Sequence, residues 1–277
     1  MLGQRGLAST PTRAYQRCME MRPLYLNGPR VSVLGLGTVK LGRREGVKYP
    51  EPFDLPSDEQ AAKLLAKAQS LGINLIDTAP AYGTSEARLG ELLGGERDEW
   101  VIVTKVGETF ENGESTFDFS PGAVRASVER SLARLRTDRV DAVLLHSDGN
   151  DTEIIERSGA FAELIKLREQ GLIGAFGVST KTVEGGMLAV DRLSDSGGGV
   201  VMLTHNLAHE AERCVIDHAH GKGIGVLIKK GLQSGRAGDP GESIRFVLGT
   251  PGVSSMVVGT INEAHLEQNS IAAGGVG

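Results

Sequence analysis

Four ionisable side chains of different chemical types lie at or just beyond the ends of three successive apolar segments. Asp77, Lys105 and His146 each close a run rich in Val, Ile and Leu, and Tyr82 follows Asp77 in the next loop. An isolated ammonium at such a position is costly to bury, so an adjacent Asp77 would compensate Lys105. This clustering of charges at strand ends is typical of a functional site.

Together these residues can protonate a substrate oxygen. A tyrosine ordinarily titrates at about pH 10, and a neighbouring ammonium is expected to lower the pKa of Tyr82. Asp77 would keep Lys105 charged, and His146 could donate a hydrogen bond to the same oxygen. The set offers no good covalent nucleophile, so we expect a nicotinamide cofactor to supply a hydride to the substrate carbon.

The elements that must position these residues repeat as an apolar strand followed by an amphipathic helix. The strand segments are β-branched and almost continuously apolar, as in parallel strands that are buried on both faces. Eight of them predict a closed (β/α)8 TIM barrel of the α/β class, with its active site at the carboxyl ends of the strands. The predicted strands are Val33–Gly37, Asn74–Asp77, Val101–Lys105, Val140–His146, Ile173–Ser179, Val200–Leu203, Gly225–Ile228 and Ser255–Val258.

Local signals mark the helices and one hairpin. Ser57 begins a capping box, and Ser120-Pro121 places an N-cap before a helix-starting proline. Asn27-Gly28 between two apolar runs predicts a β-hairpin over residues 24–33. A doubly wound sheet is the competing fold, but Gly35-Leu36-Gly37-Thr38 lacks the third glycine of a dinucleotide-binding turn. Further helices are predicted over Glu86–Leu93, Arg157–Gln170, Thr182–Leu193, Ala208–His220, Gly241–Leu248 and Asn262–Asn269.

Composition favours a single large domain and argues against several kinds of partner. The 277 residues are 40% apolar and 23% charged, with a formal net charge of −5. Without a basic stripe or an apolar run of roughly 20 residues, neither nucleic acid nor a membrane is an expected partner. Only Cys18 and Cys214 are present, which fits a reducing, cytoplasmic location. We expect residues 1–21 to be a flexible N-terminal extension and residues 22–277 to form one barrel.

Several stretches resemble the signature of the aldo-keto reductases. They are Asp77–Glu86 with Leu89-Gly90, Thr104-Lys105, Val140–His146, Gly177–Ser179 and Pro251–Val253. The resemblance covers residues 22 to 269 and implies hydride transfer between a nicotinamide cofactor and a small aldehyde, ketone or sugar. It implies that Tyr82 is the general acid. Lys105 and Asp77 would then tune Tyr82, and His146 would orient the carbonyl.

Two further segments are similar to parts of this family. The predicted hairpin at residues 24–33 resembles the plug that closes the bottom of the barrel. Asp118-Phe119-Ser120 resembles the corresponding segment of members that oxidise aldoses. The resemblance therefore implies a barrel with an N-terminal β-hairpin under it, and a sugar is one of the possible substrates.

The cofactor positions implied by the resemblance depart in part from the family pattern. Thr180 stands in place of an Asn and Met202 in place of a Gln, while Lys229 replaces an aromatic ring stacked on the nicotinamide. His265 replaces an Arg that pairs with the 2′-phosphate, and Gly259-Thr260 replaces a Lys-Ser pair. We expect NADP(H) in preference to NAD(H). The implied cofactor-binding residues are Gly37, Thr38, Asp77, Ser179, Thr180, Met202, Lys229, Lys230, Leu232, Ser234, Gly259, Thr260, His265, Gln268 and Asn269.

Lys229 and Lys230 follow the seventh strand, next to the place where barrels of this type commonly bind phosphate. Two adjacent lysines are costly to hold together unless an anion neutralises them. We therefore expect this pair to contact the phosphates of the dinucleotide, with Ser234 adding a hydrogen bond.

No metal site is expected, and two other functions remain open. One is a sensor that binds a nicotinamide cofactor with little turnover, and the other is a Schiff-base lyase acting through Lys105. Asp77 disfavours the lyase because it stabilises the ammonium form of the lysine. The expected partner is a small carbonyl or alcohol substrate, and the expected state is a monomer or small homo-oligomer. Helical spacing explains a group of histidines without a metal, namely His205, His209, His218 and His220.

Overall fold

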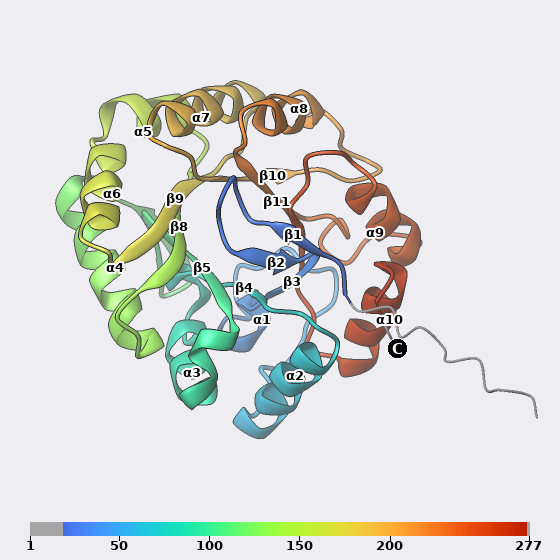
Figure 1. The fold of residues 1–277 in the computed structure, drawn as a ribbon. Coiled ribbons are helices and arrows are strands. Elements are labelled where there is room, and N and C mark those ends of the chain that lie inside the picture. Colours follow the sequence, from blue (N-terminus) through green and yellow to red (C-terminus); the bar gives the residue numbers. More distant parts are fainter. Residues whose placement is uncertain (1–18, 276–277) are drawn as a thin grey trace, which may run out of the picture.

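The computed structural model describes residues 19–275, which form a closed barrel of parallel strands inside a ring of helices (Figure 1). The barrel strands are β3 (Leu34–Gly37), β4 (Leu75–Asp77), β5 (Val101–Val106), β8 (Val140–His146), β9 (Ile173–Ser179), β10 (Val200–Thr204), β11 (Gly225–Lys229) and β12 (Ser255–Val258). They follow one another around the barrel in chain order, and β12 closes it by pairing with β3. The predicted (β/α)8 barrel is confirmed, with nearly the predicted strand bounds.

The helices surround the strands and bury one face each. They are α1 (Val39–Gly42), α2 (Asp58–Ser70), α3 (Ser85–Leu92), α4 (Pro121–Leu135), α5 (Asp151–Arg157), α6 (Ala160–Glu169), α7 (Val183–Asp195), α8 (Arg213–Gly221), α9 (Pro240–Leu248) and α10 (Glu263–Ala272). In α4, Val124 and Val128 are buried because they recur at helical spacing. Ser57 forms the predicted capping box with Gln60 at the start of α2, and Ser120 caps α4.

Two predicted helices differ from the observed ones. The segment predicted as a single helix over Arg157–Gln170 contains the end of α5 and all of α6, which are separated at Gly159. This glycine has a φ of +80°, a left-handed conformation that interrupts a right-handed helix. The helix predicted over Ala208–His220 begins only at Arg213, because the residues before it form a tight turn with its own backbone hydrogen bonds.

The N-terminal hairpin lies across one end of the barrel (Figure 1). It consists of β1 (Met21–Pro23) and β2 (Arg30–Ser32), and its turn places Asn27 at a φ of +62°. Leu24 and Val31 are fully buried and pack against apolar side chains inside the barrel. The plug is therefore present, and only its strand bounds differ from the predicted hairpin over residues 24–33.

A second hairpin, which the sequence analysis did not predict, lies between β5 and α4. It consists of β6 (Glu108–Glu111) and β7 (Glu114–Phe117), which pair in antiparallel register. Asn112 and Gly113 join the two strands, and both have positive φ. An Asn-Gly pair is a strong hairpin signal, because both residues tolerate that conformation. This hairpin follows the end of β5 at Val106 and places Glu108 beside the mouth.

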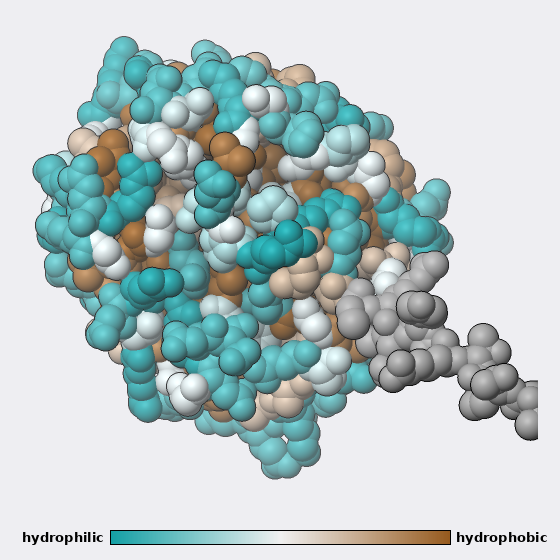
Figure 2. Space-filling view, viewed as in Figure 1, coloured by the Kyte–Doolittle hydropathy of each residue, from teal (hydrophilic) through white to brown (hydrophobic). Residues whose placement is uncertain are grey.

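Met19 is buried beside Gly72, so the folded body extends upstream of the predicted boundary at residue 22. The predicted flexible extension lies mostly in residues 1–18, outside the described residues. Figure 2 shows apolar residues interspersed with polar ones on the face that it displays. Within residues 19–275, no helix is long and apolar enough to cross a membrane.

Candidate active site

Asp77, Lys105 and Tyr82 meet at the carboxyl-terminal mouth of the barrel. The Lys105 ammonium donates hydrogen bonds to Asp77 Oδ1 at 2.6 Å and to the Tyr82 hydroxyl at 3.1 Å. It also donates to the carbonyl oxygen of Thr78 at 3.0 Å. Asp77 and Lys105 come together because β4 and β5 are adjacent parallel strands. The short 3₁₀ helix Pro80–Tyr82 brings in the tyrosine.

The electrostatics of this group differ in one respect from the expectation. Burial opposes the charge on Lys105, but Asp77 and Tyr82 outweigh burial and raise its pKa. The pKa of Tyr82 is also raised, because burial and Asp77 together outweigh the lowering effect of Lys105. The predicted net lowering of the Tyr82 pKa is therefore wrong. Tyr82 is therefore a neutral phenol near pH 7 and carries a proton, although the raised pKa makes it a weaker acid than a free tyrosine.

His146 ends β8 and lies across the mouth from Tyr82. The two rings are edge-on, with centroids 6.3 Å apart and planes at 85°. His146 Nδ1 lies 2.7 Å from Oε2 of Glu108, close enough to pair although the N–H direction deviates from a linear hydrogen bond. Burial lowers the pKa of His146, and Lys105 and Lys229 add to this effect while Glu108 opposes it.

Glu108 is a member of the site that the sequence analysis missed. Its Oε1 accepts a hydrogen bond from Ser115 Oγ at 2.6 Å and lies 3.8 Å from Nη1 of Arg43. Burial opposes ionisation of Glu108, but His146, Ser115 and Arg43 outweigh it and lower the pKa to about 2. Glu108 is therefore an anion near pH 7. The Asn112-Gly113 pair could have revealed its hairpin, but not the contact with β8.

Ser179, Thr180 and Lys229 form the opposite half of the mouth, at the ends of β9 and β11. Lys229 Nζ donates to Ser179 Oγ at 2.9 Å and to the carbonyl oxygen of Thr180 at 2.6 Å. The Thr180 hydroxyl is buried and has no hydrogen-bond partner among the described residues. This unpaired hydroxyl fits a ligand that carries both donors and acceptors, such as a carboxamide. Met202 lies deeper, in the apolar interior of the barrel.

Lys229 and Lys230 do not form the joint site that the sequence analysis predicted. Lys229 points into the mouth, where burial lowers its pKa to about 7 against the opposing effect of Glu212. Lys230 is exposed and has a φ of +57°. Burial, Lys48 and Lys181 lower the pKa of Lys230, so these three lysines form a positive rim. The pair separates because β11 ends at Lys229 and the left-handed backbone of Lys230 turns the chain away from the strand direction.

Two buried carboxylates, also missed from the sequence, support this half of the mouth. Glu212 accepts a hydrogen bond from the backbone N–H of Thr204 at 3.2 Å, and its Oε2 has no partner among residues 19–275. Asp151 Oδ2 accepts from the backbone N–H and the hydroxyl of Thr182 at 2.8 and 2.6 Å. Both acids favour the charged form of Lys229. Their positions in the sequence carry no local signal of this contact.

The remaining predicted cofactor residues lie in different settings. Thr38 is buried, and its hydroxyl donates to the carbonyl oxygen of Asp77 at 2.9 Å, so it joins two strands. Gly37 ends β3 and lies beside Gly259. A side chain at Gly259 would collide with the Tyr49 hydroxyl. Tyr49 thus covers this part of the mouth. Three of the other predicted positions are half-buried, namely Leu232, Ser234 and Thr260. On α10, His265 and Gln268 are exposed and Asn269 is buried.

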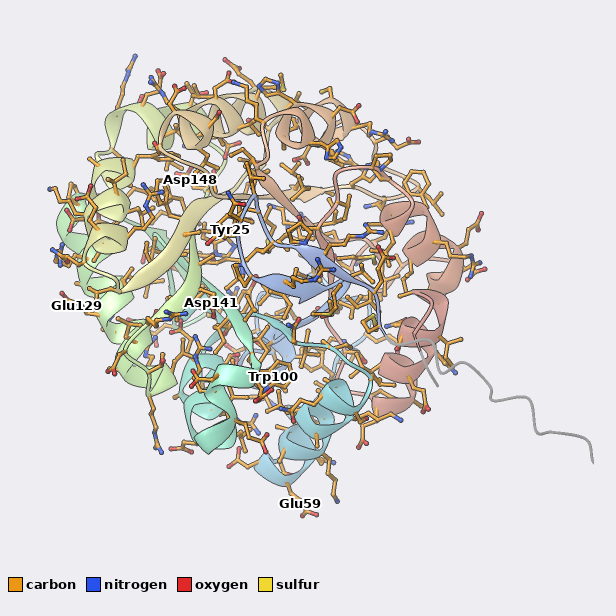
Figure 3. The ribbon with its side chains drawn as sticks, viewed as in Figure 1. Tyr25, Glu59, Trp100, Glu129, Asp141 and Asp148 are labelled. Atoms are coloured by element: carbon orange, nitrogen blue, oxygen red, sulfur yellow. The ribbon has the colours of Figure 1, made fainter. Side chains whose placement is uncertain are left out.

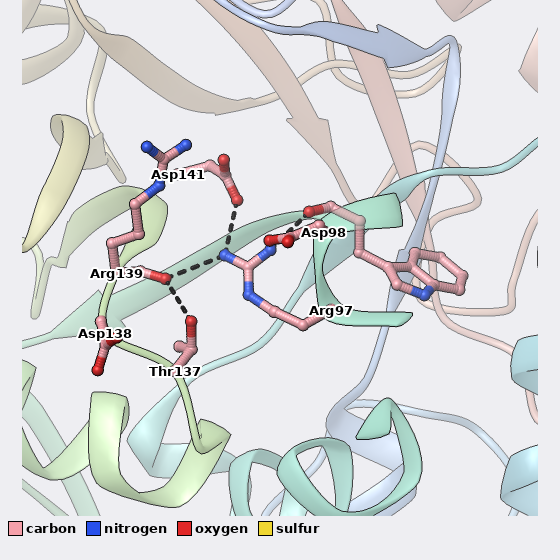
Figure 4. A pocket seen from close by; sticks show the side chains of 7 residues that line it. Arg97, Asp98, Thr137, Asp138, Arg139 and Asp141 are labelled. Carbon is pink, nitrogen blue, oxygen red and sulfur yellow. Dashed lines mark hydrogen bonds and ion pairs between the residues drawn. The ribbon is translucent and has the colours of Figure 1, made fainter. Parts of the chain in front are cut away.

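A polar hollow near the opposite end of the barrel has a structural role (Figure 4). Arg97 Nη2 donates to Asp141 Oδ2 and to the carbonyl oxygen of Arg139, both at 3.0 Å, and Nη1 donates to the carbonyl oxygen of Trp100 at 2.7 Å. Figure 3 shows Trp100 and Asp141 on the face that carries the N-terminal hairpin and Tyr25. These contacts join the beginnings of β5 and β8.

The histidines outside the mouth have separate partners. His205 Nε2 lies 3.1 Å from Thr250 Oγ1, and His218 Nε2 lies 2.7 Å from Asp191 Oδ1. In the part of the chain that the structure describes, no group of three or more His, Cys, Asp or Glu residues is arranged to hold a metal ion.

Fold and site together define a (β/α)8 barrel whose ionisable residues gather at the carboxyl ends of its strands. The sequence model of the aldo/keto reductase family matches residues 33–238. The chain belongs to the aldo/keto reductase family.

Comparisons with individual proteins agree with this assignment. The chain is 51% identical to a Pseudomonas aeruginosa protein of solved structure, provisionally assigned to the aldo-keto reductases, with a TM-score of 0.83 over 95% of this chain and 98% of that chain. It is 29% identical to L-galactose dehydrogenase of Arabidopsis thaliana, over 78% of this chain and 66% of that protein. It is 30% identical to the NADH-specific methylglyoxal reductase of Escherichia coli, over 58% of this chain and 52% of that protein. The chain thus spans about half to two thirds of the length of these curated relatives.

Proposed function

We propose that the protein is a nicotinamide-dependent oxidoreductase that interconverts a small aldehyde, ketone or sugar carbonyl and the corresponding alcohol. The observation that carries this proposal is the buried Lys105 ammonium, which contacts Asp77 at 2.6 Å and Tyr82 at 3.1 Å. A buried charge is costly to keep, so its place beside a phenol at the mouth of a barrel indicates a catalytic role.

Each residue then has a distinct part in carbonyl reduction. Tyr82 gives its proton to the carbonyl oxygen, and Lys105 stabilises the phenolate that remains. Asp77 keeps Lys105 charged through this change. His146 contacts the same oxygen from the other side of the mouth. When bound, the nicotinamide supplies the hydride that the carbonyl carbon accepts.

The cofactor would occupy the half of the mouth opposite Tyr82. Ser179, Thr180 and Lys229 are available there for the nicotinamide end, and the unpaired Thr180 hydroxyl supports this placement. The positive rim at Lys230 supports binding of phosphates through charge, as lysines bind them as point charges. NADP(H) carries one phosphate more than NAD(H), so this rim favours NADP(H). The name of the Escherichia coli relative states a preference for NADH, which makes cofactor choice a property to be measured.

The structure gives a physical reason against the Schiff-base lyase. Imine formation needs a free amine, whereas the Lys105 ammonium is held by three oxygen atoms and its pKa is raised by Asp77 and Tyr82 against the effect of burial. The non-catalytic sensor differs from the proposed enzyme only in turnover. An assay must therefore measure binding and turnover separately.

The test begins with a titration of the purified protein with NADPH and with NADH, followed by nicotinamide fluorescence. Small aldehydes and aldoses are then assayed for turnover. We expect tighter binding of NADPH and a turnover that Tyr82→Phe removes. Tyr25→Phe, at the opposite end of the barrel, is the matched control and should keep full activity. Binding without any turnover would support the sensor, and failure to bind either dinucleotide would refute both.

A further inference from the structure

The contact between Glu108 and His146 fixes the orientation of a ring at the reacting centre. His146 Nδ1 is buried, and the Glu108 carboxylate lies beside it, with Oε2 at 2.7 Å but off the direction of a linear N–H hydrogen bond. Glu108 is in turn held by Ser115 at 2.6 Å and by Arg43 at 3.8 Å. Arg43 is itself anchored, because Nη1 donates to the carbonyl oxygen of Ala81 at 3.0 Å. The carboxylate is therefore a fixed acceptor, supplied by the hairpin of β6 and β7.

This arrangement selects one tautomer of the neutral imidazole. Neutral histidine carries one N–H, and the other ring nitrogen is an acceptor. A fixed carboxylate beside Nδ1 places the proton on Nδ1, which leaves Nε2 as an acceptor. Only the doubly protonated ring can then donate from Nε2. The nitrogen that remains for the substrate therefore changes its hydrogen-bonding role with the charge of the ring.

We propose that Glu108 is a positioning residue which holds Nδ1–H of His146, so that protonation of Nε2 decides whether the mouth binds the carbonyl or the alcohol. The charged ring donates from Nε2 to a carbonyl oxygen. The neutral ring accepts at Nε2 from an alcohol hydroxyl. This inference rests on the proposed function and adds to it a determinant of which substrate binds.

The sign of the pH dependence follows from the groups that face His146. Glu108 on β6 favours the charged ring, whereas Lys105 on β5 and Lys229 on β11 oppose it, and burial opposes it most. The pKa of His146 consequently lies below its ordinary value. Tyr82 stays neutral over this range because its own pKa is raised by burial. As pH rises through the pKa of His146, KM for the carbonyl should rise, by up to about tenfold per pH unit, and KM for the alcohol should fall.

The tautomer can be measured without cofactor or substrate. Nitrogen-15 NMR of the full chain, selectively labelled at histidine, distinguishes a neutral ring protonated at Nδ1 from one protonated at Nε2. We assign the His146 signal by its loss in His146→Gln. We expect the Nδ1–H form above the pKa of His146. A neutral His146 protonated at Nε2 would overturn the proposal, whatever activity the protein has.

Variants of the hairpin test the consequence for substrate binding. Glu108→Leu removes the acceptor, allows the neutral Nε2–H tautomer and should abolish the pH dependence of KM for the carbonyl, which in the wild type falls below the ordinary histidine pKa of about 6.5. Glu111→Leu, an exposed change on the same strand, and Ser115→Ala, which keeps the carboxylate, should retain it. If Glu108→Leu keeps the wild-type dependence of KM for the carbonyl on pH, Glu108 does not position His146. The correct tautomer in a protein that turns over no carbonyl or alcohol would refute the proposed function and leave the positioning intact.

Discussion

Asp77→Asn should destabilise the barrel strongly, because it leaves the Lys105 ammonium buried without a counter-charge. The side chains of Lys105 and Asp77 are 1% and 6% exposed and 2.6 Å apart, so water can replace little of the lost interaction. Removing one partner of a buried ion pair typically costs about 3–5 kcal/mol. We expect Asp77→Asn and Lys105→Met each to lower the free energy of unfolding by about this amount, measured by urea unfolding.

The double variant Asp77→Asn/Lys105→Met should be more stable than either single variant, since neither charge remains buried, and should lie within about 2 kcal/mol of wild type. Carbonyl reduction should be lost in all three. The exposed pair Lys63–Glu59 is the matched control, and Glu59→Gln should change stability by less than about 1 kcal/mol. A loss of less than about 1 kcal/mol in Asp77→Asn, or a double variant no more stable than the less stable single variant, would contradict a stabilising buried ion pair.

The other predictions concern catalysis and the cofactor half of the mouth. Tyr82→Phe should lower carbonyl reduction by about 10²–10⁴-fold and leave cofactor affinity unchanged, because it removes only the proton donor; activity within a few-fold of wild type would exclude Tyr82 from the mechanism. Lys229→Met should raise the free energy of unfolding at pH 7. The pKa of Lys229 in the folded protein, about 7, lies below the ordinary lysine value of 10.5, so folding disfavours its charged form. In thermal unfolding, this gain should shrink as pH rises from about 7 towards about 10.5, where the unfolded chain also loses the proton; a constant gain would contradict the assignment. Replacing Lys229 and Lys230 together by Met should weaken dinucleotide binding by about 2–4 kcal/mol, because it removes one polar contact at the nicotinamide end and one charge at the phosphates, and wild-type affinity should fall with salt. If the double variant binds NADPH as tightly as wild type in a fluorescence titration, the phosphates of the dinucleotide lie elsewhere. EDTA should leave activity unchanged, because Tyr82 and His146 polarise the carbonyl; a loss restored by zinc would show otherwise.

The barrel could be predicted because its signals are local. Each strand is a short β-branched run. In a parallel barrel the carboxyl ends of all strands lie at the same face, so these ends define the mouth independently of the loop conformations. Asp77, Lys105 and His146 were therefore placed correctly before any contact was known. The helix break at Gly159 could also have been predicted, since glycine permits the left-handed conformation observed there. It was missed because the apolar spacing continues across it.

The parts that escaped prediction depend on contacts between distant segments. Glu108 meets His146 only after the hairpin of β6 and β7 folds back, and Glu212, at the start of α8, acts on Lys229 at the end of β11. The net shift in the Tyr82 pKa depends on burial, which residue types alone do not determine. The separation of Lys229 and Lys230 was accessible, however. Lys229 ends β11 and Lys230 begins the turn after it, so two neighbouring lysines need not point to one site.

The pairing of β12 with β3 also sets the order in which a growing chain can finish folding. Leu34 on β3 pairs with Met256 on β12, so the first and last barrel strands form the closing seam. Such pairing between distant segments is slow, and in synthesis from the N-terminus it must wait until β12 has emerged from the ribosome. Until then β3 and β11 each carry an open edge of apolar residues, which another chain can pair with. Shortened products ending before Ser255 would keep both edges open and so aggregate.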